Sequence, residues 1–267
     1  MTSHHVDALA VLGDGAAAAI GRHMDRAFRA FVGGAPHVAD ARTLRLVTGE
    51  PHPFGNFALV AAPVDVETTR ALVEPLVAGA TPAAVIFPDL DVPAEVDAWL
   101  AGQGFMPPAA MPAMGVDIAR LAPTSLPTGY ELVRIGAADG DEWTRQFAAG
   151  YELPLRVAAC FSPAALGADT SPDAAAQFFA IRRHDAIVAT SAMFFADGLA
   201  GIYCVSTVPE ERRKGLGAHA TAEPLRHAAT LGYRVGVLQS SAAGHGVYRN
   251  LGFGDFGGVP LYVRIPA

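Results

Sequence analysis

The sequence predicts an α/β (α+β) fold built from two similar units in tandem. Strand-like apolar runs alternate with helix-like runs, as in a mixed sheet covered by helices. The order of these runs restarts near residue 129, and landmarks of the first half recur in the second. With 267 residues, 51% of them hydrophobic, the chain can form one large domain or two of about 130 residues each.

In the first half, a helix is expected within the first 35 residues because Ile20, Met24, Phe28 and Phe31 fall on one helical face. The elements expected next are strands at 43–49 and 56–62, a helix near 65–78, a strand at 83–87, a helix at 93–102 and a strand at 113–119. The turn-rich stretch LAPTSLPT, residues 121–128, is typical of a linker.

The second half is expected to begin with a strand and a helical region and to continue with three strands. These elements are expected at 130–135, 137–166, 176–183, 186–195 and 199–208. A basic, glycine-rich turn then leads into a helix. The last expected elements are a strand at 234–239, a helix at 242–250 and a strand at 259–265.

The two halves share three landmarks in the same order. GNFALVAAP at 55–63 aligns with GIYCVSTVP at 201–209, the tripeptide EPL recurs 149 residues later, and Phe105 corresponds to Phe253. This nearly constant spacing favours a duplication, with chance similarity of two α/β units as the alternative. Between the shared proline and the shared glutamate, the first half is three residues shorter and lacks the basic glycine-rich turn.

Composition excludes several classes of protein. A net charge of −7 argues against a nucleic-acid binder, and the two cysteines, Cys160 and Cys204, argue against a disulfide framework. We find no signal peptide and no apolar run of the ~18 residues that a membrane span needs, so we expect a cytoplasmic protein. Adjacent His4 and His5 lack a second ligand cluster, and we therefore expect no metal site. The rarity of lysine beside arginine and the many alanines suggest a GC-rich bacterial genome.

The turn PEERRKGLGAHA, residues 209–220, is the strongest functional signal. Arg212, Arg213 and Lys214 directly precede a Gly-x-Gly that opens a helix, and Lys214 is the one lysine in the chain. Unpaired amides and the positive end of the helix dipole bind phosphate oxygens, and glycines allow close approach. The alternative is a solvated charged turn whose glycines merely allow the bend.

Two other phosphate-binding motifs fit poorly. A dinucleotide-binding fingerprint enters its glycines almost directly from the strand, whereas six residues, 209–214, intervene here, and the acidic residue expected about 20 positions later is missing. A Walker A loop needs Gly-Lys-Ser/Thr, whereas Lys214 precedes its glycine.

Residues 198–264 resemble the core of the GNAT (GCN5-related N-acetyltransferase) superfamily. Its acyl-CoA signature is Gln/Arg-x-x-Gly-x-Gly/Ala, and this chain has Arg212-Arg213-Lys214-Gly215-Leu216-Gly217. The preceding VSTVPEE and the later VYRNLGF resemble further blocks of the superfamily. The resemblance implies two tandem GNAT-like domains, each a mixed, mostly antiparallel sheet flanked by helices. Residues 1–120 would be a degenerate copy without the pyrophosphate loop, 121–128 a linker and 129–267 the acyl-CoA-binding domain.

The resemblance also implies site residues. The amides of 213–218 would hold the pyrophosphate of acetyl-CoA, and the side chains of Arg212, Arg213 and Lys214 would be free for charge contacts. Many members have glycine at the position of Arg213, so a positive φ there would strain this residue. The strand ending in Ser206, Thr207 and Val208 would run beside the pantetheine arm, with an N–H near Val208 polarising the thioester. The residues implied for the loop are Arg212, Arg213, Lys214, Gly215, Leu216, Gly217 and Ala218.

Tyr248 matches the superfamily's frequent general acid, which would protonate the leaving thiolate, and Ser241 falls where many members contact pantetheine. The alternative for Tyr248 is a packing role. Its counterpart in the first half is Leu100, which cannot donate a proton.

The general base is left open. The strand at 201–208 carries no carboxylate or histidine. The candidates are Glu152, His184, Asp185, a water held by Ser206, and, less favoured, His219 and His227.

The function expected is therefore transfer of an acetyl or other acyl group from acetyl-CoA to an amine, by direct attack in a ternary complex. A catalytically silent acyl-CoA sensor or scaffold is the alternative. The acceptor and the oligomeric state are left open, a homodimer among the options, and no nucleic-acid or membrane partner is expected.

Overall fold

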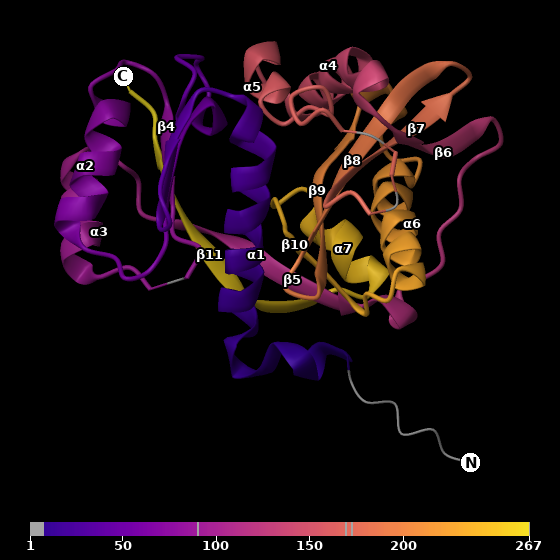
Figure 1. Cartoon of the computed structure of the whole chain (residues 1–267), viewed down its shortest axis with the longest axis horizontal. Coiled ribbons are helices and arrows are strands. Elements are labelled where there is room, and N and C mark those ends of the chain that lie inside the picture. The colour runs from indigo at the N-terminus through magenta and orange to yellow at the C-terminus, as the bar shows by residue number, and fades with distance from the viewer. Residues whose placement is uncertain (1–7, 90, 169, 172, 267) are drawn as a thin grey trace.

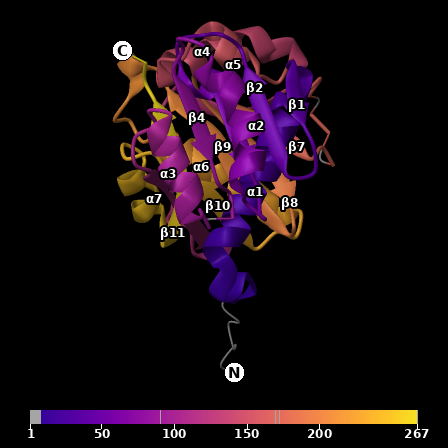
Figure 2. The ribbon, with the colours of Figure 1, turned by 90° about the vertical axis from the view of Figure 1, so that its left-hand side faces the viewer.

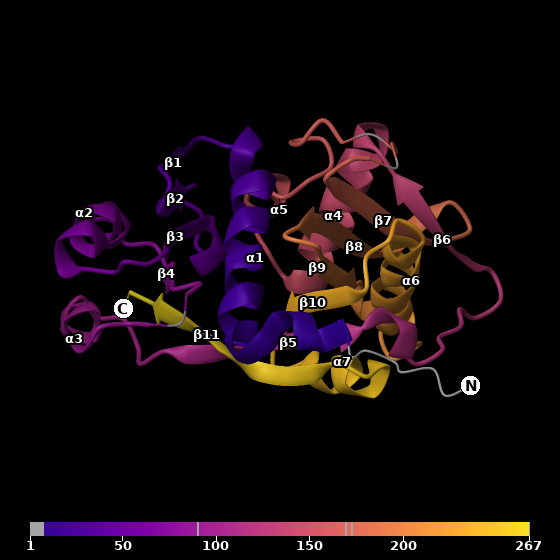
Figure 3. The ribbon, with the colours of Figure 1, turned by 60° about the horizontal axis from the view of Figure 1, so that its bottom comes forward.

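The computed structural model describes residues 8–89, 91–168, 170–171 and 173–266. All its described strands join one sheet in the order β1-β2-β3-β4-β11-β5-β10-β9-β8-β7-β6. Figure 1 shows the whole chain, and Figure 3 labels every strand. The strands are β1 (His37–Ala39), β2 (Thr43–Val47), β3 (Asn56–Val60), β4 (Ala83–Ile86), β5 (Ala109–Asp117), β6 (Tyr130–Ile135), β7 (Ala176–Arg183), β8 (Ala186–Ala196), β9 (Leu199–Thr207), β10 (Val235–Gln239) and β11 (Gly254–Arg264).

Helices cover both faces of the sheet. The helices are α1 (Ala16–Phe31), α2 (Val66–Val77), α3 (Ala94–Gly102), α4 (Gly140–Tyr151), α5 (Leu155–Ala159), α6 (Leu216–Thr230) and α7 (His245–Leu251). Side chains of α1, α4 and α5 share one apolar cluster, and those of α2 with α3 and of α6 with α7 form two clusters on the opposite face. Figure 3 shows α1 between the two halves, and Figure 2 shows α2 and α3 from their own side. None of the described helices is long and apolar enough to span a membrane.

The two halves exchange their last strands. β5 pairs with β10 of the second half, β11 pairs with β4 of the first, and β5 and β11 pair with each other, all antiparallel. The α/β class and the mostly antiparallel sheet are confirmed, whereas the two separate sheets that we expected are joined into one. The reason is the exchange, because each half supplies a strand that the other half's sheet requires.

The order of elements repeats between the halves, as the sequence landmarks suggest. β3-α2-β4-α3-β5 and β9-α6-β10-α7-β11 each contain a parallel pair joined through a helix, β3 with β4 and β9 with β10. Both crossover helices carry an interior proline, Pro75 and Pro224. The connection before α2 runs over 61–65 and the one before α6 over 208–215, so the loop is the part that differs.

Some boundaries differ from those expected. β1 was missed because its three residues are all exposed and give no apolar pattern. β5 and β11 begin four and five residues before the predicted starts at 113 and 259, in segments where exposed residues interrupt the burial pattern. The helical region at 137–166 is broken where Glu152 takes a left-handed conformation (φ 58°) before Pro154.

A buried histidine joins α1 to β9. His23 is fully buried, its Nδ1 lies 2.8 Å from the Tyr203 hydroxyl, and its ring stacks on Tyr203. A Cβ at Gly201 would lie 2.3 Å from the His23 ring, so glycine at 201 allows α1 to approach the sheet. Burial lowers the pKa of His23 from 6.5 to about 4, and the imidazole is therefore neutral in the folded protein at pH 7.

This burial predicts a pH-dependent stability. Below pH 6.5 the unfolded chain binds a proton at His23 that the folded chain excludes, so the free energy of unfolding should fall by about 3 kcal/mol between pH 6.5 and 4. Urea titrations between pH 6.5 and 4 measure how the free energy of unfolding depends on pH. His23→Gln should remove the His23 contribution to this dependence, and His37→Gln, at an exposed position, should retain it. Equal slopes in wild type and His23→Gln would contradict this account.

Candidate active site

The site forms where β9 and β10 separate. Their pairing covers Leu199–Gly201 and Val235–Val237, although β9 continues to Thr207 and β10 to Gln239. A bulge in β9 sets two residues, Cys204 and Val205, against Ser191 of β8, and Cys204 has φ 53°. The carbonyl of Cys204 accepts a hydrogen bond from Thr190 Oγ1 at 2.9 Å. The separation leaves the inner edge of β9 open toward α7.

The turn after β9 leads into α6, whose N-terminus has no side-chain cap. Arg212 has φ −64°, Arg213 has φ 63° and Gly215 has φ 79°, so left-handed residues alternate with ordinary ones. Arg212 is extended (ψ 160°), so the pattern that can turn neighbouring N–H groups toward an anion begins at the left-handed Arg213 and Gly215. Gly215 is the N-cap of α6 and provides no side-chain cap, and a Cβ at Gly217 would meet no atom closer than 3.9 Å. The first-turn amides of α6 can therefore receive a ligand.

In the first half, the N-terminus of the corresponding helix, α2, is capped by a side chain. Asp65 is the N-cap of α2, and its Oδ1 accepts a hydrogen bond from the Thr68 N–H at 2.7 Å. A carboxylate thus occupies the position where a phosphate would bind. The difference agrees with the sequence comparison, in which the first half lacks the glycine-rich turn.

The three basic side chains of the turn have different roles. Arg212 donates to the backbone carbonyls of Gly150 (2.9 Å) and Thr207 (3.3 Å). Lys214 Nζ binds Glu211 Oε2 at 2.7 Å. The Arg213 side chain has no partner in the described part of the chain. All three basic side chains were expected to be free, and Arg213 is the one that is. The expectation is wrong for Arg212 and Lys214 because each fastens the turn to the protein.

Glu211 is the anchor of this turn. Its carboxylate is 9% exposed and binds Lys214, the Arg183 guanidinium at 2.8 Å and the Tyr130 hydroxyl at 2.5 Å. These hydrogen bonds, that of Lys214 first, lower the pKa of Glu211 from 4.5 to about 2. The carboxylate therefore remains ionised through the physiological pH range. It links the turn to Tyr130 of β6 and Arg183 of β7 and also binds Lys214 within the turn.

A cavity of about 550 Å³ lies in front of this turn. Its wall combines the turn and the start of α6 with Thr207, residues 122–124 and one face of α7. It brings together seven of the predicted residues: Thr207, Arg212, Arg213, Gly215, Leu216, Gly217 and Ala218. Lys214 and Ser206 are not part of its lining.

A second cavity, of about 270 Å³, lies farther along β9. Tyr248 and Ser241 line it together with residues of α1 such as Met24 and Phe31. Because α7 and α1 pack on opposite faces of the sheet, this cavity passes through the sheet where β9 leaves β10. Val205 lines it and Thr207 lines the first cavity, so the two cavities follow each other along one strand edge.

Tyr248 lies at the junction of the two cavities. It projects from α7 into the second cavity, whereas Val247 and Leu251 of the same helix line the first. A Cβ at Gly244 would lie 2.9 Å from the Tyr248 ring, so glycine at 244 makes room for it. Burial raises the pKa of Tyr248 to about 12, and the hydroxyl is therefore protonated and able to donate. Ser241 is exposed, and its Oγ accepts from the Gly244 N–H at 3.2 Å.

The predicted role of Val208 is corrected by its backbone. The Val208 N–H donates to the Val188 carbonyl of β8 at 3.0 Å and is not free to polarise a ligand. Because successive N–H groups of a strand point to opposite edges, the N–H of Thr207 is directed toward the open edge. Ser206 is buried and packs against α4, where a Cβ at Gly150 would collide with its Oγ.

None of the side chains considered as a general base lines either cavity. Glu152 ends α4, and His184 and Asp185 are exposed in the turn between β7 and β8. His219 Nδ1 lies 3.1 Å from Thr124 Oγ1. Among the described residues no group of three or more potential metal ligands occurs, and His4 and His5 lie outside them.

Sequence reasoning missed the contribution of α1 to the site. The apolar face of Met24, Phe28 and Phe31 was identified as a helix face, but a core and a cavity wall need the same residue types. Tyr203 was also missed, although it lies in the strand identified as lining the site. The bulge is the reason, because it places Tyr203 and Cys204 on the same face of β9.

Comparison with known proteins supports the arrangement. Residues 144–253 match the model of the acetyltransferase (GNAT) family. A GCN5-related N-acetyltransferase from Kribbella flavida is similar in structure, at 22% identity and a TM-score of 0.60, covering 94% of this chain and 96% of that one. A GCN5-related N-acetyltransferase from Sphaerobacter thermophilus has 13% identity, a TM-score of 0.57 and coverages of 98% and 93%.

A putative acetyltransferase of the GNAT family from Novosphingobium aromaticivorans has 20% identity, a TM-score of 0.52 and coverages of 90% and 97%. No curated protein matches the chain in a sequence search. The structural matches show the fold over most of the chain, and the family match falls on the half that holds the open turn and Tyr248. The chain thus contains, at residues 144–253, a stretch that matches the GNAT acetyltransferase family, within a fold that it shares with these structures.

Proposed function

We propose that this protein transfers an acetyl group from acetyl-CoA to an amine by direct attack. The observation that carries the proposal is the uncapped start of α6, with φ 63° at Arg213 and φ 79° at Gly215, beside the open edge of β9. A diphosphate supplies the acceptor oxygens that these amides lack. The amides of 213–218 would bind it, and the unpaired Arg213 side chain would add a charge contact.

The rest of the donor would follow the strand edge. From the turn, the open edge of β9 leads past Thr207 and Val205 to Tyr248, which is the direction a pantetheine arm would take. The Thr207 N–H, directed to this edge, is our candidate for polarising the thioester carbonyl and stabilising the oxyanion. One such donor contributes about 3 kcal/mol in enzymes where it has been measured.

Tyr248 is proposed as the general acid. Its hydroxyl would give a proton to the departing thiolate as the carbon–sulfur bond breaks. Cys204 lines the same cavity, but burial raises the pKa of its thiol, so it stays protonated and is a poor nucleophile. This supports attack by the amine itself over an acyl-cysteine intermediate.

The first half is proposed to be a degenerate copy that binds no donor. The support is its capped helix at Asp65, its shorter loop and Leu100, fully buried, at the position of Tyr248. We therefore expect one acetyl-CoA per chain. A catalytically silent acyl-CoA sensor is the second candidate. It is favoured because no carboxylate or histidine is among the described residues that line the second cavity, and because Glu211, the one carboxylate among those that line the first, is held by Lys214, Arg183 and Tyr130.

A release assay for free CoA thiol with a panel of amines decides between the two. Turnover of any amine, with product detected by mass, supports the transferase. Acetyl-CoA binding without turnover across the panel would favour the sensor.

Two variants of Arg213 separate its charge from its backbone. Arg213→Ala should raise the KM for acetyl-CoA by about tenfold, because a charge contact to phosphate is worth about 1–2 kcal/mol. Arg213→Gly should raise KM similarly but increase stability by up to about 1 kcal/mol, because it relieves the left-handed strain. Thermal melts and initial rates measure both. Arg145→Ala, an exposed change on α4, is the matched control. If both Arg213 variants have the same KM for acetyl-CoA as Arg145→Ala, Arg213 does not contribute to the site.

Removal of the Tyr248 hydroxyl should slow the chemical step. Tyr248→Phe is expected to lower kcat by about 10²-fold or more, while the dissociation constant for CoA changes little because the ring still packs. Since the pKa is about 12, wild-type kcat should show no loss from this group between pH 7 and 10. Tyr233→Phe, which deletes a hydroxyl outside both cavities, should leave kcat unchanged. Equal kcat values in both variants would assign Tyr248 a packing role.

A further inference from the structure

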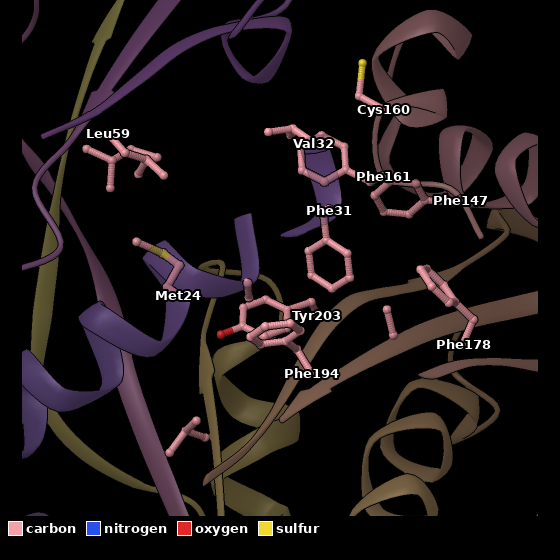
Figure 4. Close-up of a cluster of buried hydrophobic side chains, with 14 of the residues drawn as sticks. Met24, Phe31, Val32, Leu59, Phe147, Cys160, Phe161, Phe178, Phe194 and Tyr203 are labelled. Carbon is pink, nitrogen blue, oxygen red and sulfur yellow. The ribbon is translucent and has the colours of Figure 1, made fainter. Parts of the chain in front are cut away.

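The second cavity has an aromatic wall. Five phenylalanines and three tyrosines contribute to its lining, six of which are Phe28, Phe31, Phe54, Phe147, Phe161 and Tyr203. The rings contact one another. The centroids of Phe31 and Tyr203 are 5.6 Å apart, edge to face (Figure 4). Those of Phe28 and Phe161 are 5.7 Å apart, also edge to face. A flat ring that enters this space can make the same edge-to-face contacts.

The lining of this cavity carries no charge. No aspartate, glutamate, lysine, arginine or histidine is among the described residues that line it. Its polar groups are hydroxyls, the protonated Cys204 thiol and Gln239, whose Nε2 already donates to the Ile20 carbonyl at 3.0 Å. An ammonium ion that entered would lose its hydration and find no counter-charge, which costs several kcal/mol. The cavity therefore selects against protonated amines.

The cavity is large enough for a substituted ring. An apolar cavity of about 150 Å³ accommodates benzene, and this one measures about 270 Å³. Tyr151, 44% exposed, lies at its solvent side, and Tyr248 lies at the end nearest the proposed donor. A ring seated among the phenylalanines would thus direct a nitrogen substituent toward Tyr248.

We propose that the acceptor is a weakly basic aromatic amine that binds uncharged in this cavity. The inference rests on the proposed function and names its substrate class. It also accounts for the absent base, because the nitrogen of a neutral arylamine carries a free electron pair and needs no deprotonation before attack.

The proton transfers of the proposed reaction balance within the site. The nitrogen bonds to the thioester carbon, the carbon–sulfur bond breaks, and the sulfur takes its electron pair and the Tyr248 proton. The nitrogen then loses one proton, which restores the Tyr248 hydroxyl directly or through water. The products are the N-aryl acetamide and free CoA.

Two isomeric amines test the inference on the unmodified protein. 4-Ethylaniline is neutral at pH 7, whereas 2-phenylethylamine, of the same formula, is protonated. We expect kcat/KM at pH 7 to be at least about 100-fold higher for 4-ethylaniline. The rate with 2-phenylethylamine should rise as pH increases the free base, and spermidine should not react.

Three results would overturn the inference. Faster acetylation of 2-phenylethylamine or spermidine at pH 7 would exclude a neutral-amine site while leaving the transferase intact. Preference for octanoyl-CoA over acetyl-CoA, with no reaction of 4-ethylaniline, would assign the cavity to an acyl chain. Absence of any CoA binding would remove the proposed function and this inference with it.

A cavity-filling variant provides an independent test. Met111 on β5 is half-buried and lines the cavity, so Met111→Trp should raise the KM for 4-ethylaniline at least about tenfold without changing CoA affinity. Met106→Trp is the matched control, because Met106 is exposed and outside the cavity. An unchanged KM in Met111→Trp, with the thermal upshift by CoA retained, would contradict the assignment.

Discussion

The separation of β9 from β10 is the constraint on which the rest of the site depends. The two strands pair through Gly201 and Val237 and then part, and the bulge at Cys204 turns the edge of β9 away. A strand edge without a partner leaves main-chain groups available in the interior of the fold. Both cavities border this edge, and Tyr248 reaches it from α7. A ligand that completes the edge would take the place of a strand.

The exchange of β5 and β11 makes each half depend on the other, although the turn with an uncapped helix lies in the second half. β5 closes the sheet beside β10, and α1 of the first half supplies one wall of the aromatic cavity. His23 fixes α1 to β9 through Tyr203, whose ring also lines this cavity. In the proposed function, the first half would act through shape, and the second through the amides of the turn and the Tyr248 hydroxyl.

Local patterns were enough to predict most of the helices and strands and the GNAT resemblance, which the family match at residues 144–253 supports. Apolar periodicity predicted the strands at 130–135 and 176–183 to the residue, and the motif at 212–217 indicated the GNAT family. Pairing between distant segments was not predictable, because the exchange of β5 and β11 depends on contacts across the two halves. The engagement of Lys214 by Glu211, and of the Val208 N–H by Val188, is likewise a tertiary property.

Calorimetric titration with CoA, dephospho-CoA and phosphopantetheine tests the central claim most directly. If main-chain amides of the turn hold the diphosphate, CoA should bind once per chain, dephospho-CoA should bind within about tenfold of CoA, and phosphopantetheine should bind at least about 100-fold more weakly. Absence of heat with CoA, or equal affinity for all three compounds, would contradict a diphosphate site at this turn.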